Sequence, residues 1–180
     1  MRPGISYIDH RYGGGVRFPE GMTYEDFAIV PQVMYKANLI AYQHEVLYHY
    51  YVNPKSTIVG SRLAKQTDRN IFKAQMILEN SELRKQRDVL ENFYIRRVLS
   101  SMAWSLCEYG EDLEEVRRLV EYALVTYPAI AENEIISDAT LPVEKRIFIR
   151  LLLSKHFWLA NGFVYVFSSI KQLIKCFMRR

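Results

Sequence analysis

Apolar side chains recur with the spacing of one helix face over residues 27–38, which predicts a helix there. Pro31 would lie near its first turn, where a missing N–H does least harm, and Asn38 would cap its C-terminal end. Residues 39–42 and 46–52 are rich in β-branched and aromatic side chains. This composition predicts short strands. The first part of the chain is therefore expected to hold a helix followed by a small β element.

The pattern becomes strongly helical after Gly60 and stays so to the C-terminal end. Local stop and start signals divide it into several expected helices. The expected elements are residues 61–80, residues 82–108 with a stop at Gly110, a helix that Asp112 begins and that ends before Pro128, a helix that Pro142 opens, a break or kink at Asn161-Gly162, and a last amphipathic segment over 163–178.

Composition narrows the class of protein. The chain has 180 residues, of which 49% are hydrophobic, and this content excludes disorder and low complexity. Its net charge of +4 is compatible with an anionic partner but does not require one. Cys107 and Cys176 are far apart and show no zinc or disulfide spacing. No apolar leader segment follows Met1, so a cytoplasmic location is expected.

Two adjacent carboxylates, Glu25 and Asp26, lie where a loop is expected to enter a helix. A helix N-terminus keeps a carboxylate ionised and oriented, which suits a general base that accepts a proton from a hydroxyl. The alternative is that Asp26 only caps the helix, and spacing alone favours the cap.

A longer block resembles the C-terminal part of family 2 glycosyltransferases, the bacterial polysaccharide type with the GT-A fold. The segments FPEG (18–21) and YEDF (24–27) are similar to a block that this family commonly carries. Tyr48, Tyr50 and Ser56 then match a following family segment in order, with Tyr51 in place of its usual arginine. The resemblance covers residues 17–58.

The resemblance implies a mechanism and roles for four residues. Asp26 would deprotonate an acceptor hydroxyl, which would attack the anomeric carbon of a nucleotide sugar with inversion. Glu25 would position the acceptor, and Gly21 would let the backbone pass close to the sugar. Ser56 would face the diphosphate, or it would cap a turn. The acceptor would be a glycan or a lipid-linked molecule.

The resemblance also implies a donor half that this chain does not show. A complete enzyme would use Mg or Mn held by a D-x-D motif, and this chain has no D-x-D. Only 16 residues precede the matching block. We therefore expect a truncated glycosyltransferase that binds no cofactor by itself, has no metal ligands of its own, and binds nucleotide sugars weakly or not at all.

The expected fold is mainly α-helical with a small β element. Residues 1–58 would be the acceptor-side remnant of a GT-A α/β domain, and residues 59–180 a C-terminal helical bundle. The alternative function is a non-catalytic helical interaction module or a membrane-peripheral module. The basic run at residues 84–87 is interleaved with glutamates and predicts a solvated helix face, so no nucleic-acid partner is expected.

The C-terminal segment carries the expectation of membrane contact. Residues 157–170 hold no charge but are too few to span a bilayer. Lys171, Lys175 and Arg179 then recur every four residues along one helix face. This helix would lie on the anionic inner face of the membrane, or it would pack on the bundle with its basic face in solvent.

Overall fold

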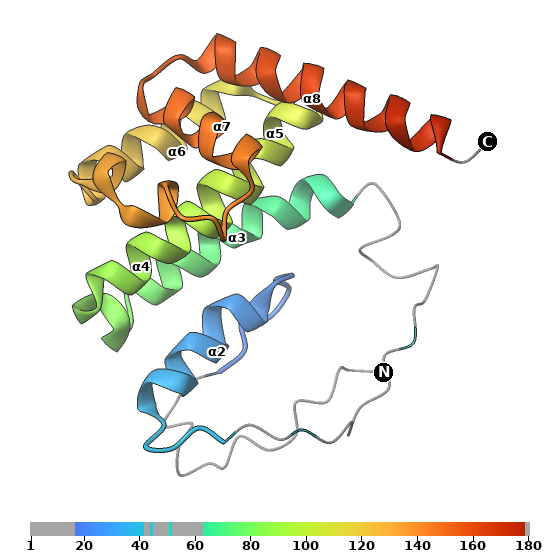
Figure 1. Cartoon of the computed structure of the whole chain (residues 1–180). Coiled ribbons are helices and arrows are strands. Elements are labelled where there is room, and N and C mark those ends of the chain that lie inside the picture. Colours follow the sequence, from blue (N-terminus) through green and yellow to red (C-terminus); the bar gives the residue numbers. More distant parts are fainter. Residues whose placement is uncertain (1–16, 42–43, 45–50, 52–62, 179–180) are drawn as a thin grey trace. The chain divides into compact units, whose positions relative to one another are not determined.

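A computed structural model describes residues 17–41, 44, 51 and 63–178 (Figure 1). The described residues are mainly helical, and none of them lies in a strand. The chain divides into two compact units, Met1–Arg87 and Asp88–Arg180. The predicted domain boundary after residue 58 lies outside the described residues.

The predicted β element is wrong for the described part of the chain. Leu39, Ile40, Ala41 and Tyr51 belong to the two predicted strands, and none of the four is in a strand. Leu39 and Tyr51 are 84% and 88% exposed. Strand propensity reflects how well a side chain fits a half-buried pleated surface. The exposed Leu39 and Tyr51 side chains have no such surface to pack against. The remaining residues of both strands lie outside the described residues.

The first unit contains α2 (Glu25–Lys36), α3 (Leu63–Glu79) and the short 3₁₀ turn η1 (Glu82–Lys85). α2 packs against α3 through a core of Ala28, Ile29 and Ala74, and further apolar side chains surround this core. Helix α2 begins two residues earlier than predicted. Pro31 consequently lies inside the helix and not in its first turn, which corrects the sequence-based expectation.

The second unit is built around a buried helical run. It begins with α4 (Arg87–Phe93), continues as the π-helical segment η2 (Tyr94–Ala103) and ends as α5 (Trp104–Glu108). Most side chains of η2 are fully buried, and η2 contacts α5, α6 and α7. The remaining elements are α6 (Leu113–Thr126), η3 (Ile130–Glu132), η4 (Glu134–Ile136), α7 (Val143–Leu153) and α8 (Phe157–Phe177).

Local signals set three helix ends in this unit, as predicted. Gly110 has a φ of 65°, and the amide of Glu111 donates to the Leu106 carbonyl at 2.9 Å, which ends α5. The side chain of Asp112 accepts a hydrogen bond from the amide of Glu114 at 2.9 Å and so caps α6. Pro142 is the N-cap of α7.

The predicted break at Asn161-Gly162 is wrong, because α8 runs through both residues without interruption. The chain turns earlier, at Lys155, whose φ is 61°. One face of α8 buries Phe157, Ala160 and Val164, and this packing outweighs the helix-weakening effect of the glycine.

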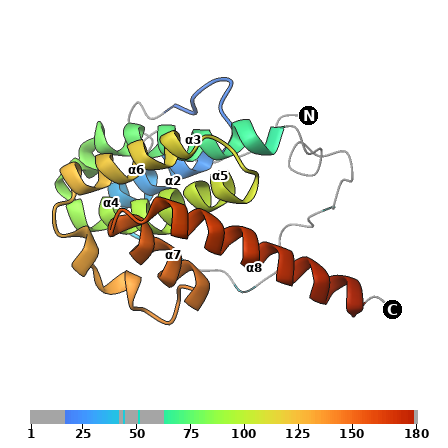
Figure 2. The same ribbon diagram turned by 90° about the horizontal axis from the view of Figure 1, so that it is seen from above.

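Helix α8 lies along α5 and α7, and its C-terminal turns extend past both of them (Figures 1 and 2). The face of α8 turned away from these helices is also apolar. Leu159, Val166, Leu173 and Phe177 form this outward face, and each is between 56% and 87% exposed. Among the helices described, none combines the length and the apolar character needed to cross a membrane.

Candidate functional site

The first candidate site is the loop that leads into α2 in the first unit. Gly21 has a φ of 67° and an open Cβ side, so the backbone turns there into the left-handed region. The Nδ2 of Asn70, a buried residue of α3, donates a hydrogen bond to Thr23 Oγ1 at 2.7 Å. This hydrogen bond fixes the loop to the neighbouring helix two residues before α2 begins.

Helix α2 begins at an unusual N-cap. Tyr24 holds this position with a φ of 58°, and its side chain makes no capping hydrogen bond. Its ring stacks on that of Phe27 with 5.2 Å between the centroids, and its carbonyl accepts from the Phe27 amide at 3.1 Å. Asp26 therefore lies inside the first turn, and the interpretation of Asp26 as an N-cap is wrong.

Three of the four predicted site residues lie in this loop and turn. Glu25 is half-buried and Asp26 is exposed, and both belong to the first turn of α2. The positive end of the helix dipole stabilises negative charge at that position. Among the described residues Asp26 has no hydrogen bond or ion pair, so its carboxylate faces solvent and can meet a substrate hydroxyl. Ser56 lies outside the described residues.

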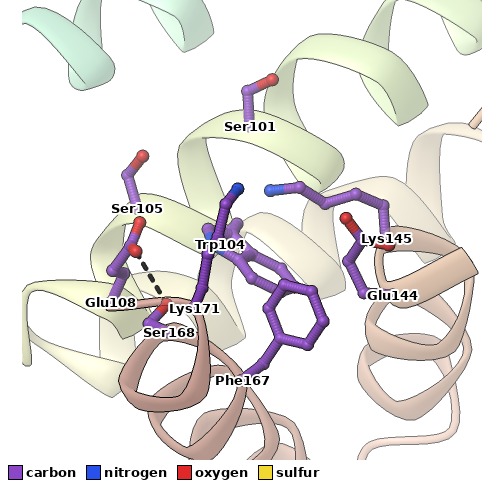
Figure 3. A pocket seen from close by; sticks show the side chains of 9 residues that line it. All are labelled: Ser101, Trp104, Ser105, Glu108, Glu144, Lys145, Phe167, Ser168 and Lys171. Carbon is purple, nitrogen blue, oxygen red and sulfur yellow. Dashed lines mark hydrogen bonds between the residues drawn. The ribbon is translucent and has the colours of Figure 1, made fainter. Parts of the chain in front are cut away.

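The second candidate site is a polar cavity of about 270 Å³ in the second unit (Figure 3). Trp104 lies at its base, wedged edge-on against the rings of Phe148 and Phe167 at centroid distances of 5.2 and 5.7 Å. Three serine hydroxyls, two carboxylates and two ammonium groups line the remainder. The lining residues are Ser101, Trp104, Ser105, Glu108, Glu144, Lys145, Phe167, Ser168 and Lys171.

Lys145 is the most perturbed group of this cavity. Its Nζ lies 3.7 Å from the centroid of the Trp104 ring, which is a cation–π contact. Burial, opposed by Glu108 and Glu144 and assisted by Lys171, lowers the pKa of the Lys145 ammonium to about 8. Figure 3 shows the side chains of Lys145 and Lys171 reaching toward one another above Trp104.

Neither of these lysines has a carboxylate within 4.0 Å among the described residues. Glu108, the carboxylate that acts most strongly on Lys145, accepts a hydrogen bond from Ser168 Oγ at 2.7 Å. The cavity thus brings two ammonium groups together without a direct ion pair. Glu108 and Glu144, which line the same cavity, balance the two positive charges without forming an ion pair with either ammonium group among the described residues.

A second cavity of about 350 Å³ adjoins the polar one. It shares Glu144, Phe167 and Lys171 with the polar cavity, and its other walls are the apolar side chains of Ile170, Ile174 and Met178. We call the two spaces the polar cavity and the apolar cavity. Together they offer a charged region and an apolar region along the same side of α8.

Sequence reasoning missed this pair of cavities. Lys145 stands between Glu144 and Arg146, a pattern typical of a solvated helix surface, and only the packing of α7 against α5 and α8 reveals its position. Cys107, on α5, is buried in the core of the second unit. Burial raises the pKa of its thiol to about 11, so it is a poor nucleophile.

Neither metal-ligand groups among the described residues nor similarity to known proteins assigns a ligand or a function to these two sites. In the part of the chain that the structure describes, no three His, Cys, Asp or Glu side chains gather to hold a metal ion. The described residues therefore do not fit the divalent metal that the resemblance implies. Comparison of the chain with protein-family models, with curated proteins and with solved structures found no match.

Proposed function

We propose that this chain acts on the acceptor side of sugar transfer, with Asp26 as the general base. The observation that carries the proposal is the exposed Asp26 carboxylate in the first turn of α2, which has no hydrogen bond or ion pair among the described residues and follows the left-handed turn at Gly21 by five positions. Residues 17–58 resemble family 2 glycosyltransferases and would belong to the acceptor-side remnant of a GT-A domain. This resemblance supports the same role.

In this proposal Asp26 accepts the proton of an acceptor hydroxyl on a glycan or a lipid-linked molecule. The acceptor oxygen then forms a bond to the anomeric carbon of a nucleotide sugar. The bond from that carbon to the nucleoside diphosphate breaks on the opposite face, so the configuration inverts. Glu25 orients the acceptor, and the role that the resemblance gives to Ser56 is contact with the diphosphate.

The test is a transfer assay with a panel of nucleotide sugars and a lipid-linked acceptor. Asp26→Asn should lower transfer about 100-fold or more, because a positioned general base contributes on that scale. The matched control is Glu20→Gln, an exposed carboxylate of the same loop, which should leave transfer unchanged. Circular dichroism should show that both variants keep the helical content of the parent chain.

Acceptor binding gives a readout that does not depend on the donor. Addition of the acceptor should shift the backbone NMR resonances around Asp26, and Asp26→Asn should weaken that binding. Shifts at Asp26 without transfer would support the acceptor-side role. The proposal would be refuted if the chain neither transferred sugar nor bound the acceptor at this turn.

The outward face of α8 favours a second function, that of a membrane-peripheral module. Leu159, Val166, Leu173 and Phe177 leave a continuous apolar stripe in solvent, and the exposed Lys171 supplies positive charge on the same helix. This combination fits an anionic bilayer surface. Flotation with phosphatidylglycerol vesicles tests it, because Leu173→Glu should abolish flotation whereas Val125→Glu, which replaces another exposed apolar residue, should not.

A further inference from the structure

We propose that the polar and apolar cavities form one binding site for a single-chain amphiphile. Its anionic head, a carboxylate or a phosphate, binds between Lys145 and Lys171, and its apolar tail occupies the apolar cavity. This inference concerns the second unit alone and does not depend on the role of Asp26.

The head position follows from the charges of the polar cavity. Lys145 lies over the Trp104 ring, and in Figure 3 its side chain and that of Lys171 extend toward one another. Neither lysine forms an ion pair among the described residues, although Glu108 and Glu144 line the same cavity. An oxyanion between them would receive charge-assisted hydrogen bonds from both ammonium groups. The hydroxyl of Ser105 lines the same space and supplies a further donor.

The tail position follows from the adjacency of the two cavities. Glu144, Phe167 and Lys171 line both of them, so a ligand whose head lies at Lys171 can extend its tail along α8 into the apolar cavity. Ile170 and Ile174, each about half exposed in the absence of a ligand, would be covered by the tail. Burial of this apolar surface favours binding by about two- to fourfold for each methylene.

The charges that face Lys145 predict how binding depends on pH. Glu108 on α5 and Glu144 on α7 favour its protonated form, whereas burial and Lys171 on α8 disfavour it. A bound anion also favours the protonated form of Lys145. Lys145 therefore keeps its proton to a higher pH in the complex than in the free protein. Affinity should therefore be greatest below pH 8 and should fall as the pH rises above it.

The experiment is isothermal titration calorimetry of the full chain with decanoate below its micelle concentration. We expect saturable binding, and Lys171→Gln should weaken it about tenfold or more. Ile174→Asn should also weaken it, because this change puts an amide on the wall of the apolar cavity. Lys171 and Ile174 are exposed, so both variants should fold. Arg118→Gln, an exposed cation on α6, is the matched control and should bind like the parent.

Three further ligands separate the possible outcomes. Acetate has the head without the tail, decyl maltoside has the tail with a neutral head, and both should bind at least tenfold more weakly than decanoate. Vesicles of phosphatidylglycerol test whether the head comes from a bilayer lipid, in which case Lys171→Gln should reduce binding to vesicles and to decanoate alike. Absence of decanoate binding, equal binding of decyl maltoside, or vesicle binding without decanoate binding would each overturn the proposal.

Discussion

Lys145 should reduce the stability of the second unit when no ligand is bound, and its replacement by methionine tests this directly. Burial lowers the pKa of the ammonium from its ordinary 10.5 to about 8. Each tenfold change in a protonation equilibrium corresponds to about 1.4 kcal/mol, so the ceiling for this effect is about 3 kcal/mol. Solvent still reaches part of the side chain and screens the charge, which reduces the expected gain to about 1 kcal/mol.

Methionine suits this test because it keeps the length of the lysine stem. Its sulfur can stay in contact with the Trp104 ring, so the substitution removes the charge without opening a cavity. Lys145→Met should therefore raise the free energy of unfolding at pH 7. Both tryptophans, Trp104 and Trp158, lie in the second unit, so tryptophan fluorescence during urea unfolding follows this unit.

The dependence on pH identifies the cause. Between pH 8 and 10.5 the native state has already released the Lys145 proton, whereas the unfolded state still holds it. The free energy of unfolding of the parent should consequently rise relative to that of Lys145→Met across this window. At still higher pH the two proteins should converge. A constant difference from pH 7 to 11, or a loss of stability in Lys145→Met at pH 7, would refute the reasoning, and Arg118→Met serves as the control for removal of an exposed cation.

Three further predictions concern the second unit. Asp112→Ala should cost about 1 kcal/mol of unfolding free energy in urea titrations, whereas Asp112→Asn should cost little, because asparagine also caps a helix. Tyr94→Phe removes a buried 2.7 Å hydrogen bond to a carbonyl of α6, and the same titration should show a loss of about 1–3 kcal/mol. In a thiol-labelling assay at pH 8 the exposed Cys176 should react quickly, and the buried Cys107, whose pKa is about 11, only after unfolding. Rapid modification of Cys107 in the native Cys176→Ser chain would contradict this.

Signals that act within a few residues were readable from the sequence. Gly110 and Asp112 end and begin helices because the chemistry of an αL turn or a side-chain cap depends on near neighbours. The prediction of a break at Asn161-Gly162 was wrong because contacts between segments distant in sequence decide the structure there. Contacts between α8 and the helices beneath it, made by residues such as Ala160 and Val164, hold that stretch helical, and a local rule does not include them.

The two candidate sites also differ in how far the sequence could predict them. The carboxylates at Glu25 and Asp26 are neighbours in sequence, so their place in the first turn of a helix could be predicted, although the N-cap at Tyr24 could not. The polar cavity joins residues 101–108 of one helical run with residues of α7 and α8. Its charge balance depends on distances between segments about 40 and 60 positions apart, and no spacing rule in the sequence expresses them.

The π-helical segment η2 has a consequence for how this protein can change during evolution. Hydrogen bonds in a π-helix join residues five apart, and Ser101 Oγ repeats this spacing by donating to the Arg96 carbonyl at 3.2 Å. A π-helical stretch holds an extra residue relative to the α-helical path between the same ends, so loss of one residue from η2 can be absorbed by relaxation to α-helical hydrogen bonding. Trp104 and the residues after it would then keep their place among the phenylalanine rings. Elsewhere in this helical run a single-codon deletion would rotate everything after it by about 100°, so η2 is the part of the run where a deletion is best tolerated.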